Sequence, residues 1–270
     1  MKCDEIIKKL ESLSPASFAE EWDNVGLLAG RRDKEVSTVY IALDATDEVV
    51  KEAVRLGADL LLTHHPLIFK KMGRITTEDF IGRRLVELLR NDISYYAMHT
   101  NFDVMGMAEA AADYLELQDR QVLCVTYEKN FDKKDFDAET RFNEGFGRVG
   151  RLGKSMTVAE FAAFVKLRFD VPNVRVYGSL EDIVELAAVM PGSGGSFICD
   201  VINAGAKVMV TGDIGHHEGI DAVAQSLTII DAGHYGIEKL FIAYMEKFIK
   251  RELPGLTVCA AEIKEPFVVV

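Results

Sequence analysis

Two adjacent histidines stand where an apolar segment ends. His64 and His65 directly follow the run ADLLL and precede Pro66, a residue that strand interiors exclude. Ligands of open α/β sheets bind at the carboxyl ends of strands, and neighbouring side chains can converge there because the backbone turns. The pair is therefore a candidate metal site. The alternative is a turn that carries two exposed imidazoles.

A second candidate lies at the end of the next apolar run. His99 closes the segment ISYYAMH, and Asp103 follows four residues later. In a parallel sheet, His99 reaches the same edge as the histidine pair, and Asp103 could join them around a divalent ion. Imidazole and carboxylate donors suit zinc, iron, manganese, nickel or cobalt. His99 is explained equally well as a direct ligand or as a histidine that supports the ligands.

Two motifs near the carboxyl end add further candidates. In GHYGIE, a helix that begins near His234 places Glu238 one turn later on the same face, and such a pair can bind one metal ion. In TGDIGHH, Asp213, His216 and His217 follow an apolar run. These three residues could line the same pocket, or they could simply cap a helix.

A glycine-rich segment is a candidate anion site. It consists of Gly192, Ser193, Gly194, Gly195 and Ser196, between a predicted strand and a predicted helix. Glycines in such a position let backbone N–H groups approach an anion, although a tight turn is the favoured alternative. The segment matches neither GxGxxG nor GxxxxGK[ST], so it implies no nucleotide-binding family.

The elements that must position these residues alternate between short apolar runs and amphipathic stretches. This alternation predicts an α/β fold with mostly parallel sheets covered by helices. The predicted strands are residues 39–45, 58–64, 93–99, 174–178, 184–190, 207–212, 227–232 and 256–263, and the clearest late helices are 155–169 and 234–253.

The two halves of the chain resemble each other. RLGADLLLTHH matches NAGAKVMVTGD, and AMHTNFD matches AGHYGIE, which pairs His99 with His234 and Asp103 with Glu238. We therefore predict two related α/β lobes with pseudo-two-fold symmetry. The lobes are residues 1–127 and 148–253. Residues 128–147 form a surface connection, and 254–270 contain a C-terminal strand.

Composition excludes several classes of protein. The 31 Lys and Arg residues are outnumbered by 43 Asp and Glu, for a formal charge of −12, which disfavours nucleic-acid binding. No apolar run approaches the ~18 residues that span a bilayer, and the N-terminus is typical of an amphipathic helix, so we expect a cytoplasmic protein. The four cysteines are scattered without a CxxC motif, which argues against disulfides and a cysteine zinc site.

The motif set resembles one known family over nearly the whole chain. WDNVGLLAG, ALDAT, LLTHHPLIF, HTNFD, GSGGS, TGD and GHYGIE occur here in the order typical of the Nif-three-like dinuclear-metal proteins, whose members are often labelled GTP cyclohydrolase 1 type 2 homolog. The resemblance implies two similar lobes that face each other across a metal-binding cleft, to which the C-terminal strand in 254–270 returns. It also implies a toroidal homohexamer with two divalent metal ions per subunit. The ligands that it implies are His64, His65, Asp103, His234 and Glu238.

Two functions follow as hypotheses. The first is a metal-dependent hydrolase of cyclohydrolase or phosphoesterase type that acts on a small nucleotide-like or phosphorylated substrate, because two metals ~3.5–4 Å apart can activate water. In this hypothesis His99 is a general acid or base, or a residue that supports the ligands. The second is a non-catalytic hexameric scaffold for metal handling or protein interaction. The residues identify neither the metal nor the substrate.

Overall fold

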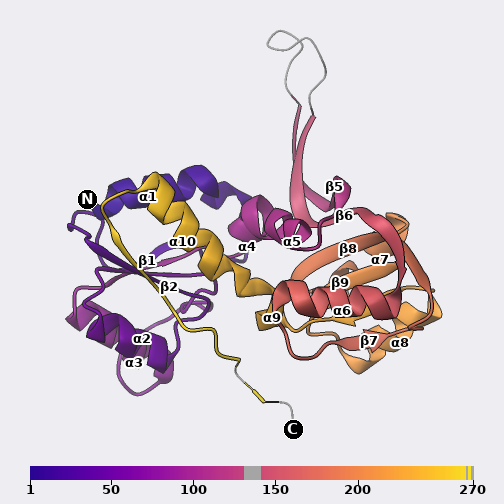
Figure 1. Cartoon of the computed structure of the whole chain (residues 1–270). Helices are drawn as coiled ribbons and strands as arrows, with labels where there is room; N and C mark the ends of the chain where they lie inside the picture. The colour runs from indigo at the N-terminus through magenta and orange to yellow at the C-terminus, as the bar shows by residue number, and fades with distance from the viewer. Residues whose placement is uncertain (131–140, 266, 269–270) are drawn as a thin grey trace. The chain divides into compact units, whose positions relative to one another are not determined.

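The chain folds into two compact α/β units. The computed structural model describes residues 1–130, 141–265 and 267–268, without the side chains of 129–130 and 141–142. One unit comprises Met1–Phe102 with Phe241–Val270, and the other comprises Asp103–Leu240. Each unit contains one β-sheet with helices packed on it (Figure 1), so the predicted fold class is confirmed.

The first unit is built on a five-stranded sheet in the order β1-β4-β3-β2-β11. All neighbouring strands are parallel except β1 and β4. Its elements are α1 (Cys3–Leu13), η1 (Ala16–Phe18), β1 (Gly26–Ala29), β2 (Thr38–Ala42), α2 (Asp47–Arg55), β3 (Leu60–Thr63), α3 (Phe80–Arg90), β4 (Ser94–Ala97), α4 (Thr100–Phe102), α10 (Leu240–Glu252) and β11 (Thr257–Ala260).

Helices cover both faces of this first sheet, which explains why its central strands are apolar throughout. Figure 1 shows α2 and α3 on one face, and α1 and α10 on the other. Every residue of β3 is buried, as expected for a parallel strand between two helical layers. Tyr40, Leu61 and Tyr95 pack with Val50 and Leu85 on the α2–α3 side.

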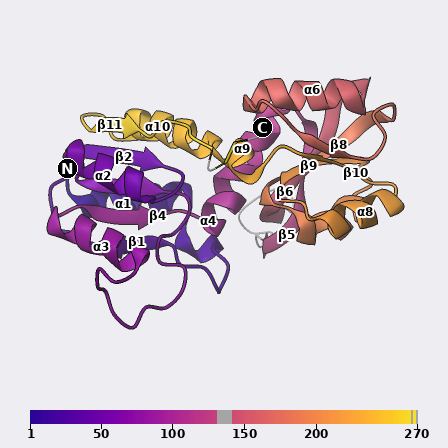
Figure 2. The same ribbon diagram turned by 90° about the horizontal axis from the view of Figure 1, so that it is seen from below.

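The second unit is built on a six-stranded sheet in the order β5-β6-β8-β9-β10-β7. Its elements are η2 (Asp103–Met107), α5 (Ala108–Tyr114), β5 (Gln118–Asn130), β6 (Arg141–Thr157), α6 (Val158–Phe169), β7 (Arg175–Tyr177), β8 (Ile183–Ser193), η3 (Gly195–Phe197), α7 (Ile198–Asn203), β9 (Val208–Gly212), α8 (His216–Ala224), β10 (Thr228–Asp231) and α9 (His234–Glu238). Figure 2 shows α6 on one side of β8, β9 and β10, and α8 on the other.

The second sheet is mixed, so the prediction of mostly parallel sheets holds only for the first. Strands β8, β9 and β10 are parallel, whereas β5, β6 and β7 pair antiparallel with their neighbours. The parallel strands are the apolar runs that βαβ alternation predicted. The antiparallel strands carry more polar residues and give a weaker signal.

The predicted surface connection at 128–147 is corrected by the strand pairing. Its described ends continue β5 and β6, where Glu128 pairs with Asn143 in an antiparallel ribbon of the second unit. Residues 131–140 lie outside the described residues. The two strands are rich in charged residues, and they therefore lack the apolar alternation that identifies a strand in a sequence.

The boundary between the units also differs from the predicted one. It falls after Phe102 and again after Leu240, not at 127 and 148. Helix α10 was assigned to the second lobe, but the Phe241 ring lies 5.2 Å from the Phe102 ring in the first unit. The predicted C-terminal strand is β11, which extends the first sheet beside β2. An amphipathic pattern shows that a helix has a buried face, but not which core it joins.

The predicted internal repeat is visible in local backbone geometry. Gly57 and Gly205 both have positive φ, +62° and +78°, and both end a helix before a buried strand. Their N–H groups donate to Val54 and Ile202, respectively, three residues earlier. Glycine is suited to this position because it adopts the left-handed conformation without a steric cost.

Strand register shifts the later part of the repeat by one residue. The Met98 N–H donates to the Thr63 carbonyl, and the Ala232 N–H donates to the Thr211 carbonyl. Met98 therefore corresponds to Ala232. It follows that His99 corresponds to Gly233 by register, and not to His234 as the sequence match indicated.

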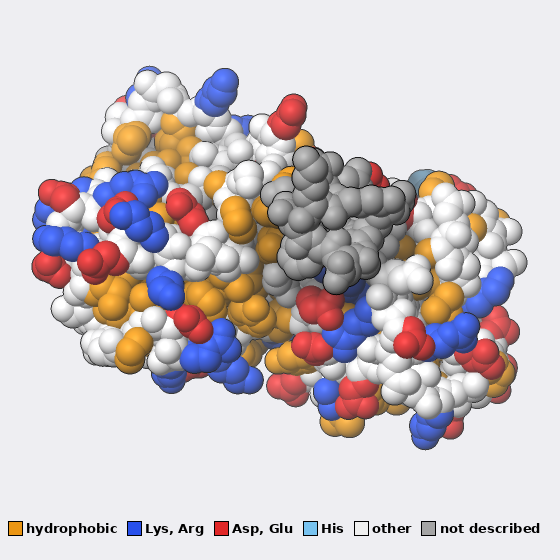
Figure 3. All heavy atoms as spheres, turned by 90° about the horizontal axis from the view of Figure 1, so that it is seen from above, with side chains coloured by type: hydrophobic (Ala, Val, Ile, Leu, Met, Phe, Trp, Pro, Cys, Tyr) orange, Lys and Arg blue, Asp and Glu red, His pale blue; other side chains and the backbone are white. Residues whose placement is uncertain are grey.

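No helix among the described residues is long and apolar enough to cross a membrane. On the face shown in Figure 3, Lys and Arg side chains are interspersed with Asp and Glu side chains and do not gather in one basic area.

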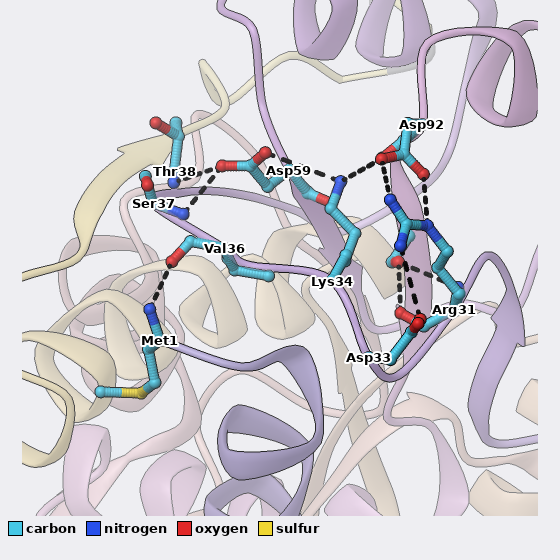
Figure 4. Close-up of polar contacts among 10 residues, drawn as sticks. Met1, Arg31, Asp33, Lys34, Val36, Ser37, Thr38, Asp59 and Asp92 are labelled. Carbon is cyan, nitrogen blue, oxygen red and sulfur yellow. Dashed lines mark hydrogen bonds and ion pairs between the residues drawn. The ribbon is translucent and has the colours of Figure 1, made fainter.

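A buried lysine ties together the amino ends of three strands in the first sheet (Figure 4). The Lys34 side chain is 5% exposed, and its ammonium lies 3.6 Å from a carboxylate oxygen of both Asp59 and Asp92. It also donates to the backbone carbonyls of these two residues. Asp59 in turn accepts from the N–H groups of Ser37 and Thr38. The network aligns β2, β3 and β4 at the end opposite to the histidines.

We expect Lys34→Met to lower the free energy of unfolding by about 1–3 kcal/mol, because it removes the ammonium that donates to the Asp59 and Asp92 carbonyls and pairs with both carboxylates. Urea denaturation of the variant and the unaltered protein measures the difference. Lys8→Met is the matched control. Lys8 forms an exposed pair with Asp4, and its loss should change stability far less than the loss of Lys34. Equal effects of the two substitutions would contradict the structural role of Lys34.

Candidate metal centre

The turn after β3 is held by a buried tyrosine. The Tyr95 hydroxyl accepts a hydrogen bond from the Leu67 N–H at 2.8 Å, and it lies 2.8 Å from Thr63 Oγ1 and 3.0 Å from the His65 carbonyl. Burial raises the pKa of this hydroxyl to about 12, so it stays protonated. Tyr95 therefore fixes the backbone that carries His64 and His65.

Three imidazoles of the first unit converge at the carboxyl edge of its sheet. Ring centroids are 4.9 Å apart for His64 and His65, 5.3 Å for His64 and His99, and 5.6 Å for His65 and His99. One nitrogen of each ring lies within 4.8 Å of the corresponding nitrogen of the other two. Three nitrogen donors at such spacing can bind one divalent ion.

In each of these imidazoles, Nδ1 lies within hydrogen-bonding distance of an oxygen atom. Nδ1 of His64 lies 2.7 Å from the Met98 carbonyl, Nδ1 of His65 lies 2.8 Å from Asp44 Oδ1, and Nδ1 of His99 lies 2.9 Å from Asp23 Oδ1. Carbonyl and carboxylate oxygens accept hydrogen bonds, so the proton is assigned to Nδ1. The Nε2 lone pair then remains for a metal, which is the usual arrangement of metal-binding histidines.

The side chain of Asp23 is inaccessible to solvent beside His99 and remains ionised. Burial on its own raises the pKa of a carboxyl group, but hydrogen bonds from His99 and Thr100 outweigh this effect and lower the pKa of Asp23 to about 2. The Thr100 N–H donates to Asp23 Oδ2 at 3.0 Å, and the Thr100 hydroxyl donates to the same oxygen. The negative charge of Asp23 therefore orients the His99 ring.

A second donor set lies within the second unit, on the short helix α9. Nε2 of His234 lies 2.9 Å from Oε2 of Glu238, and Nδ1 of His234 lies 2.9 Å from Oδ2 of Asp213. Glu238 is buried. The predicted i,i+4 pair is confirmed as a geometric pair, and Asp213 supports the histidine in the way that Asp23 and Asp44 support His99 and His65.

The glycine-rich segment lies against two carboxylates. A Cβ atom at Gly192 would come within 2.5 Å of Glu238 Oε1, and one at Gly195 within 2.3 Å of Glu218 Oε1. These glycines therefore allow the backbone to approach acidic side chains closely. Anion binding at residues 192–196 stays a prediction, and an anion there would meet the repulsion of both carboxylates.

The remaining candidates occupy different positions in the second unit. Asp103 begins η2, a π-helical turn of a kind that is often found at functional sites, and it is half-buried. His216 and His217 begin α8, are exposed, and have ring centroids 5.3 Å apart. The lining role considered for these two histidines stays a prediction.

Two functional residues were missed in the sequence, namely Asp23 and Asp44. Asp44 follows β2 as His65 follows β3, and these strands are parallel neighbours. The rule that side chains converge at the carboxyl ends of parallel strands could therefore have identified Asp44. No spacing rule could have identified Asp23, because it is 76 residues from His99.

The donor chemistry of both units fits a divalent transition metal. The first unit offers three imidazoles, and the second offers an imidazole with an adjacent carboxylate. Nitrogen and carboxylate donors suit zinc, iron, manganese, nickel and cobalt, and no thiolate is among them. The oxygen partner at each Nδ1 matches the support that such ligands require.

The comparisons with known proteins identify the family of this chain. The model of the family Duf34/NIF3 (NGG1p interacting factor 3) matches residues 1–266. A protein of Clostridium perfringens named GTP cyclohydrolase 1 type 2 homolog is 35% identical over 271 residues, which cover 99% of each chain. The chain belongs to the Duf34/NIF3 family.

Solved structures show the same fold. The crystal structure of a Bacillus cereus protein related to NIF3 matches with a TM-score of 0.88 and 27% identity, and covers 100% of this chain and 99% of its own. The structure titled Reduced HcgD from Methanocaldococcus jannaschii matches with a TM-score of 0.79 and 31% identity, over 96% and 97% of the two chains.

We expect Asp44→Ala to weaken zinc binding roughly 10- to 100-fold, because His65 loses the partner that orients its ring and favours the Nδ1–H tautomer. Competition for Zn²⁺ against a chromogenic chelator measures the affinity. Asp33→Ala is the control, since Asp33 is an exposed aspartate of the same unit whose side chain is 80% accessible. Unchanged zinc affinity in Asp44→Ala would show that His65 does not bind metal.

Proposed function

We propose that this protein is a divalent-metal-dependent hydrolase that acts on a small nucleotide-like or phosphorylated substrate. One observation carries the proposal. His64, His65 and His99 converge, and each has its Nδ1 hydrogen-bonded to an oxygen, which leaves the Nε2 atoms as donors. Such pre-oriented imidazoles are typical of metal sites, and hydrolysis is a common reaction of open metal centres.

We propose that His64 and His65 hold metal together with Asp103, His234 and Glu238, and that the centre contains two ions. The support from the first unit is the histidine cluster. The support from the second unit is the His234–Glu238 pair and its orientation by Asp213. Two ions per chain are the expectation of the family resemblance, and the metal-to-protein ratio tests it.

A bound divalent ion would lower the pKa of a coordinated water and polarise a substrate oxygen. The protein itself supplies proton transfer. His99 is paired with the ionised Asp23, and a carboxylate in this position stabilises an imidazolium. His99 can therefore accept a proton from a nucleophile and return it to a leaving group, unless it is itself a metal ligand.

The names of the relatives support a nucleotide substrate. Proteins named GTP cyclohydrolase 1 type 2 homolog are 35% and 38% identical to this chain. A cyclohydrolase reaction requires the attack of water on a ring carbon and proton transfer to the ring nitrogen. A metal centre beside a His–Asp pair has the groups for both steps.

The central test combines elemental analysis with a substrate panel. We expect about two divalent ions per chain in natively purified protein, and metal-dependent hydrolysis of at least one nucleotide or phosphoester. Glu238→Gln should lower both metal content and turnover at least about tenfold, because it removes a carboxylate donor. Glu246→Gln is the control, because Glu246 pairs with Lys250 at the protein surface.

Two results would contradict the proposal. The first is hydrolysis by Glu238→Gln protein as fast as by the unaltered protein, which would show that Glu238 has no role in the site. The second is a protein that retains its metal but hydrolyses nothing in the panel with any of the candidate ions restored. The second result would support the non-catalytic metal-binding scaffold.

We also propose that the chain assembles into a toroidal homohexamer, an expectation that rests on the family resemblance. Light scattering coupled to size exclusion should give a mass about six times that of the 30.0 kDa chain. A mass equal to that of one or two chains at micromolar concentration would contradict it.

A further inference from the structure

Two exposed aromatic rings stand beside the histidine cluster. Trp22 is 59% exposed and Phe69 is 51% exposed, although large aromatic side chains are usually buried. Their ring centroids lie 5.8 Å apart and 6.2 Å and 6.4 Å, respectively, from the ring of His99. The planes of the two rings are tilted by 58°, so neither ring covers the face of the other.

Hydrogen bonds of neighbouring residues hold both rings in place. Asp23, next to Trp22, binds His99, and Asn24 donates from its side chain to the Ile68 carbonyl at 2.6 Å. Ile68 directly precedes Phe69. The two aromatic residues are thus tied to each other and to the metal centre through the polar residues beside them.

The segment that carries Phe69 is basic in an acidic protein. Residues 66–77 contain Lys70, Lys71 and Arg74 and no Asp or Glu, whereas the whole chain has a formal charge of −12. All three basic side chains are exposed. This local positive charge is complementary to an anionic ligand, because charge of one sign around a site raises the local concentration of ligands of the opposite sign.

We propose that Trp22 and Phe69 form a stacking platform that binds the planar ring of an anionic heteroaromatic substrate, such as a nucleotide, beside His99. The inference rests on the proposed hydrolase function and names the residues that select the substrate class. Stacking on aromatic side chains suits any planar base. The platform would hold the ring within reach of the metal centre while the basic segment attracts its phosphate.

Trp22 is the only tryptophan of the chain, so its fluorescence reports directly on the platform. We expect AMP to quench this fluorescence saturably in the metal-loaded protein, with free tryptophanamide as the correction for light absorption by the nucleotide. Ribose 5-phosphate carries the same anionic group without a ring and should cause no quenching.

Substitutions separate stacking from metal binding. Phe69→Ala should weaken AMP binding roughly 5- to 150-fold while zinc content stays unchanged. Trp22→Ala should have a similar effect, measured by calorimetry because the fluorophore is lost. Phe80→Ala is the matched control. Phe80 is a 54% exposed phenylalanine at the start of α3, and its loss should leave AMP affinity within about twofold.

The outcomes distinguish this inference from the proposed function. Saturable quenching that Phe69→Ala weakens supports the platform even if no substrate of the panel is hydrolysed. Absence of quenching by AMP, or equal quenching by ribose 5-phosphate, overturns the platform even if the protein proves to be a metal-dependent hydrolase. Equal effects of Phe69→Ala and Phe80→Ala would overturn it as well.

Discussion

The hydrogen bond at Nδ1 of each site histidine is the interaction on which the proposed chemistry depends. It fixes the ring plane of each imidazole, and in His64, His65 and His99 it assigns the proton to Nδ1 and the lone pair to Nε2. Nε2 of His234 instead lies 2.9 Å from Glu238 Oε2. His64 uses a backbone carbonyl for this purpose, whereas His65, His99 and His234 use the carboxylates of Asp44, Asp23 and Asp213. Without these oxygens, the imidazoles would rotate freely and would bind a metal ion less tightly.

In the first sheet, the residues that stabilise the strand alignment lie at one end of the strands, and the candidate metal ligands lie at the other end. At the amino ends of the strands, Lys34 links Asp59 and Asp92 and fixes how the strands are aligned. At the carboxyl ends, Tyr95 supports the turn that carries His64 and His65. Because parallel strands share one direction, alignment at one end determines which side chains meet at the other.

Much of the site could be predicted from the sequence, because local signals define it. His64 and His65 were predicted as metal ligands because they end an apolar run. His234 and Glu238 were predicted because they are one helical turn apart. Asp23 could not be found in this way, because its hydrogen bond to His99 joins segments 76 residues apart. Apart from Asp23, the site follows from strand and helix periodicity.

The fold was predictable where the core is apolar and was missed where it is polar. The buried strands β3, β8, β9 and β10 are apolar runs and were identified, whereas much of the ribbon of β5 and β6 was interpreted as a connection. The charged residues of this ribbon can be accommodated in β-strands because few of their side chains face a hydrophobic core. The assignment of α10 to a unit depends on tertiary packing, which no periodicity encodes.

The first unit is discontinuous in the chain, since Phe241–Val270 completes a body begun by Met1–Phe102. On the ribosome, the whole second unit emerges before α10 and β11 are synthesised. Until then, one face of the first sheet has no α10 to cover it, and β2 remains an open edge. Biogenesis therefore ends with the docking of a late helix and strand, and the nascent chain carries an exposed apolar surface of the kind that chaperones bind.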